Sequence, residues 1–169
     1  MSLRVFVTVG STAFPSLFTI INTVEFLEAL NPSQLFIQTG SSNPDLEIVK
    51  ELMKEEDLEI FDYDVNYEDF IDRCDLVIGH TGAGTTIDVL SRNKYFVSVI
   101  NTSLMDNHQE ELASKLNDIS SRVTVTTPED LLDAIKSLDP ASIRFGPKSS
   151  YKNSEGNFLP SVIDQMLLE

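Results

Sequence analysis

The chain has 169 residues, of which 41% are hydrophobic, so it is long enough for one globular domain, or up to one and a half, with a buried core. Its 12 basic residues against 27 acidic ones give a net charge of −15, which argues against direct binding to nucleic acid or to anionic lipid, because both need clustered Lys and Arg. No apolar run approaches the roughly 18 residues of a membrane-spanning helix, the N-terminus lacks a signal-peptide pattern, and the single cysteine, Cys74, excludes an internal disulfide framework and a cysteine-based zinc site.

Short apolar runs alternate with longer amphipathic stretches, which is typical of α/β proteins. Strands are predicted at residues 3–9, 35–38, 58–63, 75–79, 95–100 and 122–126. Between the first two strands, an apolar stripe at three- and four-residue spacing runs from Phe14 to Leu27 and predicts a helix.

Further helices are predicted at residues 44–56, 67–73, 85–92 and 107–116. Thr127, followed by Pro128 and two acidic residues, is typical of a helix start, with Thr127 as the cap and Pro128 at the first position. Most of the strands are too apolar to be half-exposed, so the elements predict a Rossmann-like, doubly wound parallel sheet of six strands.

Composition divides the chain into three parts. Residues 1–138 carry the predicted α/β domain, residues 139–157 are rich in Pro, Ser, Gly and Lys and predict a linker, and residues 158–169 predict an amphipathic C-terminal helix. That helix either packs on the domain's own sheet or docks on a partner. Deleting it separates the two, because unfolding supports the first and loss of a complex with a folded domain supports the second.

In a doubly wound sheet, ligands bind outside the carboxyl ends of the strands, where the strand order switches. The first candidate segment there is Gly10-Ser11-Thr12, directly after the first strand. Glycine permits a tight turn and a close approach of the backbone to an anion, and the two hydroxyls add donors. A simple strand-to-helix turn explains the same residues, so this segment alone leaves both interpretations open.

The second candidate segment combines three glycines with three threonines at a strand-to-helix junction. It reads Gly79-His80-Thr81-Gly82-Ala83-Gly84-Thr85-Thr86, and the free amides of a helix N-terminus there form a cradle for an anion. Ile87 stands where a third glycine would complete the dinucleotide-binding fingerprint, and the Gly-Lys-Ser/Thr of a P-loop is absent. The segment therefore indicates an anion site and argues against NAD.

Two side chains beside this segment have two interpretations each. Asp88 lies about one turn into the helix, within reach of a ribose hydroxyl, or it is a surface acid favoured by the helix dipole. His80 either hydrogen-bonds a ligand or holds two loops together.

The third candidate segment, residues 101–109, is a polar loop that enters a predicted helix. Asp106 or Asn107 is placed to cap that helix, and His108 and Gln109 lie in its first turn, where they face a ligand. The chain's two histidines form no metal-ligand motif, and the Gly-x-Ser-x-Gly pattern of many hydrolases is absent.

Together, the second and third segments resemble the nucleotide-sugar half of MurG-like glycosyltransferases, in which two Rossmann-like domains face a cleft (the GT-B fold). The family pattern is Ser-His-Ala-Gly, then Gly and Thr or Ser, then an acid, and further along His-Gln or Gln-Gln. This chain has Gly79-His80-Thr81-Gly82-Ala83-Gly84-Thr85, then Asp88, then Asp106-Asn107-His108-Gln109. The segment Val9-Gly10-Ser11-Thr12, after the first predicted strand, matches the family's opening phosphate loop. The resemblance covers residues 3 to about 138.

The chain is also similar to the soluble subunits of the eukaryotic UDP-N-acetylglucosamine (UDP-GlcNAc) transferase of asparagine-linked glycosylation. These are similarly short, begin with a Phe-Val-Thr-x-Gly strand and carry Ser-Leu-Met-Asp-Asn-His-Gln. Here the two motifs read Phe6-Val7-Thr8-Val9-Gly10 and Ser103-Leu104-Met105-Asp106-Asn107-His108-Gln109. The chain departs from the MurG-like pattern at Thr81, where Ala is usual, at Asp88, where many bacterial members have Glu, and at Asn93-Lys94-Tyr95, where Gly-Lys-Pro is common.

The resemblance implies an inverting transfer of GlcNAc from UDP-GlcNAc to dolichyl-diphosphate-GlcNAc, without a metal or other cofactor. His108 and Gln109 would orient the donor, with Asp88 on the ribose and the two glycine loops on the diphosphate. The expected donor-binding residues are Gly10, Ser11, Thr12, His80, Gly82, Ala83, Gly84, Thr85, Thr86, Asp88 and Asn107.

The resemblance further implies an obligate membrane-anchored partner that brings the acceptor side. We expect the general base to come from this partner, because the chain offers no convincing candidate. The partner would recruit an otherwise cytoplasmic chain to the cytosolic face of the endoplasmic reticulum.

Two other functions stay open: a non-enzymatic UDP-sugar-binding or regulatory module, and a different nucleotide-using enzyme on the same fold. Activity only alongside a membrane partner favours the transferase subunit. Binding of UDP-GlcNAc without activity favours the module, and binding of another nucleotide in place of any UDP-sugar favours the third function.

Overall fold

The computed structural model describes residues 2–101 and 120–146 of the chain. Within these residues, one parallel sheet has the strand order β3-β2-β1-β4-β5-β6. The strands are β1 (Leu3–Thr8), β2 (Pro32–Gln38), β3 (Leu58–Phe61), β4 (Leu76–His80), β5 (Tyr95–Val99) and β6 (Val123–Thr126). The predicted Rossmann-like sheet is confirmed, and each predicted strand lies in it.

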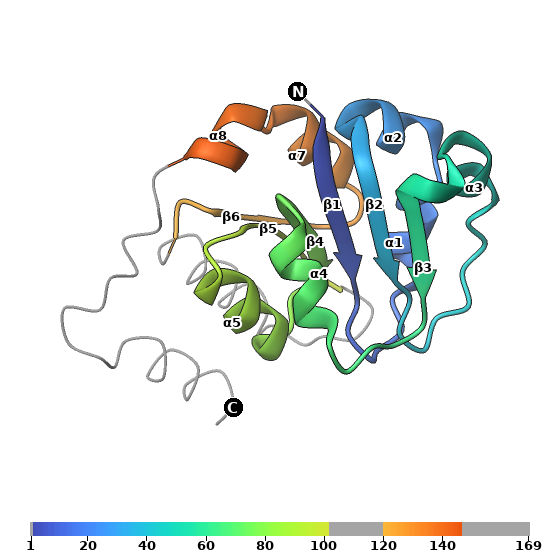
Figure 1. The fold of residues 1–169 in the computed structure, drawn as a ribbon, viewed down its shortest axis with the longest axis horizontal. Helices are drawn as coiled ribbons and strands as arrows, with labels where there is room; N and C mark the ends of the chain where they lie inside the picture. The colour runs from blue at the N-terminus through green and yellow to red at the C-terminus, as the bar shows by residue number, and fades with distance from the viewer. Residues whose placement is uncertain (1, 102–119, 147–169) are drawn as a thin grey trace.

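Helices cover both faces of the sheet, with α4 and α5 on one side (Figure 1). The helices are α1 (Pro15–Ile21), α2 (Val24–Leu30), α3 (Glu47–Leu52), α4 (Tyr67–Arg73), α5 (Ala83–Ser91), α7 (Leu131–Ser137) and α8 (Pro140–Phe145), and Glu55–Asp57 form the 3-10 helix η1. Side chains alternate along the strands, so Val5 and Val7 pack under α1, α2 and α7, whereas Phe6 packs under α4 and α5. None of the described helices is long and apolar enough to cross a membrane.

The strand order switches between β1 and β4, which lie side by side at the centre of the sheet. Thr8 pairs with Gly79, so the two strands end at the same level. A Cβ atom on Gly79 would lie 2.7 Å from the carbonyl oxygen of Thr8, so only glycine permits this approach. The loops after β1 and β4 therefore leave the sheet at the point where ligands bind in such folds.

The apolar stripe that predicted a helix over residues 14–27 is divided between α1 and α2. Asn22 follows α1, and its side-chain oxygen accepts from the N–H of Val49 at 3.2 Å. Thr23 starts α2, because its hydroxyl accepts from the N–H of Phe26 at 3.2 Å. The stripe continues across the break because both helices pack on the same face of the sheet.

Thr127 begins a turn and not a helix, which corrects the predicted start. Its hydroxyl accepts from the N–H of Asp130 at 3.4 Å and lies 3.2 Å from the Asp130 carboxylate, and α7 begins one residue later at Leu131. The helix predicted at 44–56 is likewise shorter, since α3 ends at Leu52.

The first part of the predicted linker is folded on the domain as α8. Asp139 caps this helix by accepting from the N–H groups of Ala141 and Ser142 at 3.1 Å each, and Ile143 is buried in the core. The rest of the segment 139–157, the helix predicted at 158–169 and the one predicted at 107–116 lie outside the described residues. The domain boundaries and the docking of the last helix therefore stay predictions.

Candidate functional site

The loop after β1 is held in shape by the loop after β2. Ser41 donates its N–H to the carbonyl of Thr12 at 3.1 Å, and Phe14 donates its N–H to the hydroxyl of Ser42 at 3.0 Å. The loop after β2 was not among the predicted segments, although Thr-Gly-Ser-Ser at residues 39–42 has almost the composition of the loop after β1.

Two glycines with positive φ make this contact possible. Gly10 has φ +61° and Gly40 has φ +59°. A Cβ on Gly40 would lie 2.3 Å from the Thr12 carbonyl oxygen and 2.8 Å from that of Gly10, both backbone atoms that cannot turn away. Ser11 and Thr12 are exposed at the carboxyl edge of the sheet, so the β2 loop supports them from behind.

The junction after β4 ends in a helix N-terminus without a side-chain cap. Gly82 is the N-cap residue of α5 and offers no side-chain acceptor to the first amides. The N–H groups of Ala83, Gly84 and Thr85 belong to the first turn, where α-helix geometry provides no backbone acceptor. A Cβ on Gly84 would have no atom within 4 Å in the described structure. Open space over free amides is what an anion needs.

Two threonine hydroxyls of this junction, those of Thr81 and Thr86, are used within the protein. Thr81 and Ser98 of β5 share a hydrogen bond of 2.8 Å, and Thr86 donates to the carbonyl of Gly82 at 2.8 Å. These two hydroxyls are therefore not free for a ligand, and the backbone amides of the first turn of α5 are the main candidates.

The imidazole of His80 lies between the two loops. A Cβ placed on Gly10 would be 3.4 Å from its Cε1, and one placed on Gly82 would be 2.5 Å from its Nε2. Its Nδ1 is buried without a hydrogen-bond partner, and burial lowers the pKa of the ring, which favours the neutral form. Of the two predicted roles, the packing between the loops is directly visible, whereas a hydrogen bond to a ligand stays a prediction.

Asp88 lies on α5 and faces α4. The hydroxyl of Tyr67 donates to its Oδ2, and its Oδ1 lies 3.9 Å from the guanidinium of Arg92. Burial, followed by this hydrogen bond, raises the pKa of Tyr67, so the phenol stays a donor. Tyr67 was not among the predicted site residues, because its position beside Asp88 depends on the packing of α4 against α5.

Backbone hydrogen bonds of Thr39 and Gly40 join the loop after β2 to the end of β3, at the carboxyl edge of the sheet. The N–H of Thr39 donates to the carbonyl of Phe61 at 2.9 Å, and Gly40 donates to that of Asp62 at 2.8 Å. The loops after β1, β2 and β3 are thus joined by backbone hydrogen bonds, which fixes the amides of this edge before any ligand arrives.

The structure brings Gly10, Ser11, Thr12, His80 and the segment 82–86 to one edge of the sheet. Asn107, His108 and Gln109, which complete the predicted set, lie outside the described residues. Among the described residues, His, Cys, Asp and Glu form no group of three or more that would hold a metal ion, and the expected independence from metal stays a prediction.

Comparison with known sequences identifies a family and a set of named relatives. The family described as Glycosyltransferase family 28 C-terminal domain matches residues 4–166. The UDP-N-acetylglucosamine transferase subunit ALG13 of Homo sapiens is 36% identical over 118 residues, which are 67% of this chain and 10% of that protein. The protein of the same name from Yarrowia lipolytica is 34% identical over 121 residues, which are 68% of this chain and 61% of that protein. The chain thus spans about a tenth of the human relative.

Two solved structures share the fold. An NMR solution structure of ALG13 has a TM-score of 0.63 at 24% identity and covers 99% of this chain and 96% of that one. The crystal structure of MurG from Acinetobacter baumannii has a TM-score of 0.69 at 19% identity and covers 100% of this chain, but 50% of that chain. The fold seen here therefore corresponds to about half of MurG.

Proposed function

Because this chain belongs to the glycosyltransferase family 28 C-terminal domain family, we propose that it is the UDP-GlcNAc-binding subunit of an inverting N-acetylglucosaminyltransferase. The observation that carries the proposal is the uncapped first turn of α5, which lies beside the Gly10 loop where the strand order switches. The names of the relatives support UDP-GlcNAc as the donor.

Negative charge grows on the UDP leaving group as the glycosidic bond breaks. The amides of Ala83, Gly84 and Thr85 would stabilise that charge together with the loop of residues 10–12. The loop of residues 10–12 needs no reorganisation at that moment, because the hydrogen bonds of the β2 loop hold it in place. Preorganised donors of this kind commonly contribute a large part of the rate enhancement.

Asp88 would accept from the ribose hydroxyls. Its carboxylate already accepts from Tyr67, but an ionised carboxylate has about four lone-pair sites and therefore keeps capacity for the ribose. The contact with Tyr67 would orient the carboxylate before the nucleotide binds. His80 and Asn107 would contact the donor, and His108 and Gln109 would orient its sugar or diphosphate.

A partner would supply the acceptor side. The relatives' printed name, subunit, supports a partner. We place the general base on this partner. We further propose that it is membrane-anchored, that it presents dolichyl-diphosphate-GlcNAc, and that it recruits this chain to the cytosolic face of the endoplasmic reticulum.

Reconstitution with a co-expressed membrane partner tests the proposal. We expect transfer of GlcNAc from UDP-GlcNAc to dolichyl-diphosphate-GlcNAc only when both proteins are present, and we expect chelation of divalent metal to leave the rate unchanged. His108→Ala should lower the turnover, and unchanged kinetics would remove the donor-orienting role of His108. Tight UDP-GlcNAc binding without transfer alongside any partner would instead indicate a binding module, and binding of a different nucleotide would indicate another enzyme.

A further inference from the structure

A second polar site lies at the amino edge of the sheet, away from the loops that form the proposed donor site. A cleft of about 810 Å³ opens there between the starts of β1 and β4, the turns before β5 and β6, and α8. Its lining contains the cations Arg4, Arg92, Lys94, Arg122 and Arg144 and a single carboxylate, Asp75. We call these six residues and the space between them the basic cleft.

The basic cleft runs against the charge of the whole chain. The chain has 12 basic and 27 acidic residues, and five of those basic residues line this one cleft. Cations that share a partly desolvated space repel one another, because the local dielectric screens them less than bulk water does. Such a cluster needs compensation by anions, and the described ion pairs supply only part of it.

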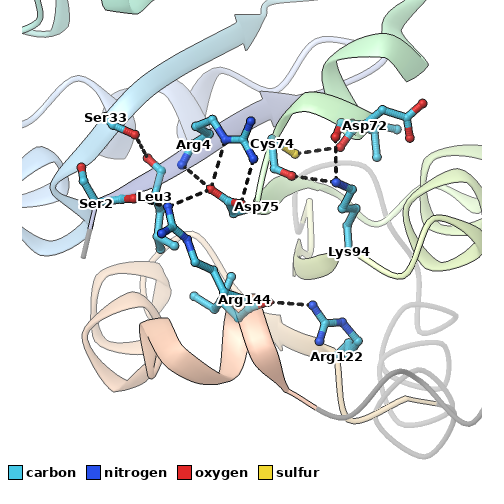
Figure 2. A network of polar contacts seen from close by, with 12 residues as sticks. Ser2, Leu3, Arg4, Ser33, Asp72, Cys74, Asp75, Lys94, Arg122 and Arg144 are labelled. Atoms are coloured by element: carbon cyan, nitrogen blue, oxygen red, sulfur yellow. Dashed lines mark hydrogen bonds and ion pairs between the residues drawn. The ribbon is translucent and has the colours of Figure 1, made fainter.

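Asp75 compensates for one of two guanidinium groups. Figure 2 shows its carboxylate between Arg4 and Arg144. It accepts from the backbone N–H of Arg4 at 2.9 Å, from the Arg4 guanidinium at 3.2 Å and from the Arg144 guanidinium at 3.3 Å. The Nε of Arg144 is buried and has no hydrogen-bond partner. One positive charge of this pair is therefore left over.

Two further cations have hydrogen bonds but no carboxylate within ion-pair distance among the described residues. The ammonium of Lys94 donates to the backbone carbonyls of Asp72 and Cys74 at 2.8 and 2.9 Å. Arg122 donates to two backbone carbonyls at α8 and its C-terminal end, at 2.7 and 3.4 Å. Carbonyls satisfy the N–H groups without cancelling the charge.

Arg122 is the most enclosed of these cations, with an exposed fraction of 5%. Its Nε is buried without a hydrogen-bond partner. Arg92 is different, because it pairs with Glu68, Asp72 and Asp88 outside the lining. Among the described residues, the lining itself holds five cations against one carboxylate, and neither Lys94 nor Arg122 has a carboxylate within ion-pair distance.

We propose that the basic cleft binds a phosphate or diphosphate group. A phosphate monoester suits such a lining, because it brings about −1.5 to −2 charges at neutral pH and three strong acceptor oxygens, more than a single carboxylate. The cations of the lining come from several elements, and guanidinium groups pair well with phosphate. A cleft of about 810 Å³ has the size of a small-molecule site.

Phe145 adds an apolar surface at the rim. It is 73% exposed and belongs to the lining of the cleft. A flat aromatic ring beside cations favours a phosphate that is attached to an organic group over an inorganic ion alone. The same chemistry is offered by a soluble phosphorylated compound and by a phospholipid headgroup. The site lies apart from the donor loops, so it does not depend on the proposed transferase function.

The test is an NMR titration of the full-length, ¹⁵N-labelled chain with inorganic pyrophosphate, in which the backbone amides of the basic cleft and those of the donor loops are followed separately. We expect saturable shifts of the backbone amides of Arg4, Asp75 and Lys94. Arg4→Gln and Arg144→Gln should each weaken the binding about tenfold, the loss expected for a charged hydrogen bond. Lys50→Gln is the matched control, because Lys50 is an exposed cation on α3, and its substitution removes the same charge at a place away from the cleft.

Vesicles separate the two sources of the phosphate. Binding of the full-length chain to phosphatidylcholine vesicles that contain phosphatidic acid, but not to phosphatidylcholine alone, assigns the headgroup, and pyrophosphate binding without vesicle binding assigns a soluble compound. Absence of saturable shifts, equal weakening by Lys50→Gln, or tighter binding of an oligoglutamate peptide than of pyrophosphate would each overturn the proposal. The spectra of the variants show at the same time whether each one is folded.

Discussion

Gly82→Ala introduces a methyl group into space that the imidazole of His80 already occupies. The new Cβ would lie 2.5 Å from Nε2, 3.0 Å from Cε1 and 3.2 Å from Cδ2 of that ring. All three separations are shorter than an ordinary contact, so the ring must leave its place between the loops or the start of α5 must shift. Overpacking of this kind costs about 1–3 kcal/mol, and alanine is a poorer N-cap than glycine by about 0.5–1 kcal/mol.

A double-mutant cycle separates the two contributions. His80→Ala removes the ring, so adding Gly82→Ala to that variant should cost only the capping part. We therefore expect a coupling free energy of about 1–3 kcal/mol between the two positions, measured by urea unfolding of the wild type, both single variants and the double variant. The single variant Gly82→Ala should lower Tm by about 2–4 °C for each kcal/mol lost.

Gly84→Ala is the control for this cycle. Its Cβ would meet no atom within 4 Å, and its φ is not positive, so no clash is expected. Alanine in a helix is favoured over glycine, and we expect a free energy of unfolding equal to that of the wild type or up to about 1 kcal/mol higher. Additivity of His80→Ala and Gly82→Ala within about 0.5 kcal/mol would refute the placement of the imidazole between the loops.

Three further predictions concern the contact between the first two loops, the buried imidazole and the ion pair at the amino edge of the sheet. Gly40→Ala should lower the free energy of unfolding by about 2–5 kcal/mol, because alanine disfavours the left-handed backbone and its Cβ would clash with the loop after β1. A loss below about 1 kcal/mol in urea unfolding would contradict the contact between the loops after β1 and β2. Burial lowers the pKa of His80 below the ordinary 6.5, so the stability that the neutral ring contributes is complete above that pH and is lost as the pH falls below it. In urea unfolding series from about pH 7 to about pH 5, the free energy of unfolding of His80→Asn should therefore fall less than that of the wild type. An equal fall in both proteins would be evidence against a buried neutral ring. Burial alone would raise the pKa of Asp75, but hydrogen bonds from Arg4 hold it below the ordinary 3.8, so the stability from this ion pair is present above that pH and is lost as the pH falls through the lowered pKa. Asp75→Asn should lower the free energy of unfolding by about 1–3 kcal/mol at neutral pH and make it depend less on pH in the acid range. An unchanged dependence in the acid range would argue against the ion pair.

The strands were predictable because a central parallel sheet is buried on both faces. Val5, Phe6 and Val7 are fully buried although they point to alternate sides, and such strands stand out as continuous apolar runs. The helix ends were less predictable, because Thr23 and Thr127 have the same capping chemistry but only Thr23 starts a helix directly. The chain after Thr23 continues directly into α2, whereas the chain after Thr127 first forms a turn, and α7 begins only at Leu131.

The glycine loops of the candidate site were visible in the sequence, whereas the contacts between distant residues, at that edge and at the amino edge of the sheet, were not. Arg4 and Asp75 are 71 residues apart and meet only because β1 and β4 are neighbours in the sheet. Hydrogen bonds across loops, such as that between Phe14 and Ser42, likewise depend on strand order.

The departure from the family's Gly-Lys-Pro turn has a structural explanation. Asn93 has φ +55°, a left-handed conformation that asparagine adopts more readily than most residues other than glycine. The turn before β5 therefore forms without glycine at this position. Lys94 then donates to two backbone carbonyls, which fixes the turn against the end of α4.

Binding of the nucleotide-sugar donor tests the central claim most directly. In an NMR titration of the full-length chain with UDP-GlcNAc, UDP-glucose and NAD, with the membrane partner absent and then present, we predict saturable binding of UDP-GlcNAc and none of NAD. The shifted backbone amides should be those of Gly10 and Ser11 after β1 and those of Ala83, Gly84 and Thr85 at the start of α5. Saturable binding that leaves these five amides unmoved, or no binding of UDP-GlcNAc in either state, would contradict the assignment of this edge of the sheet as the donor site.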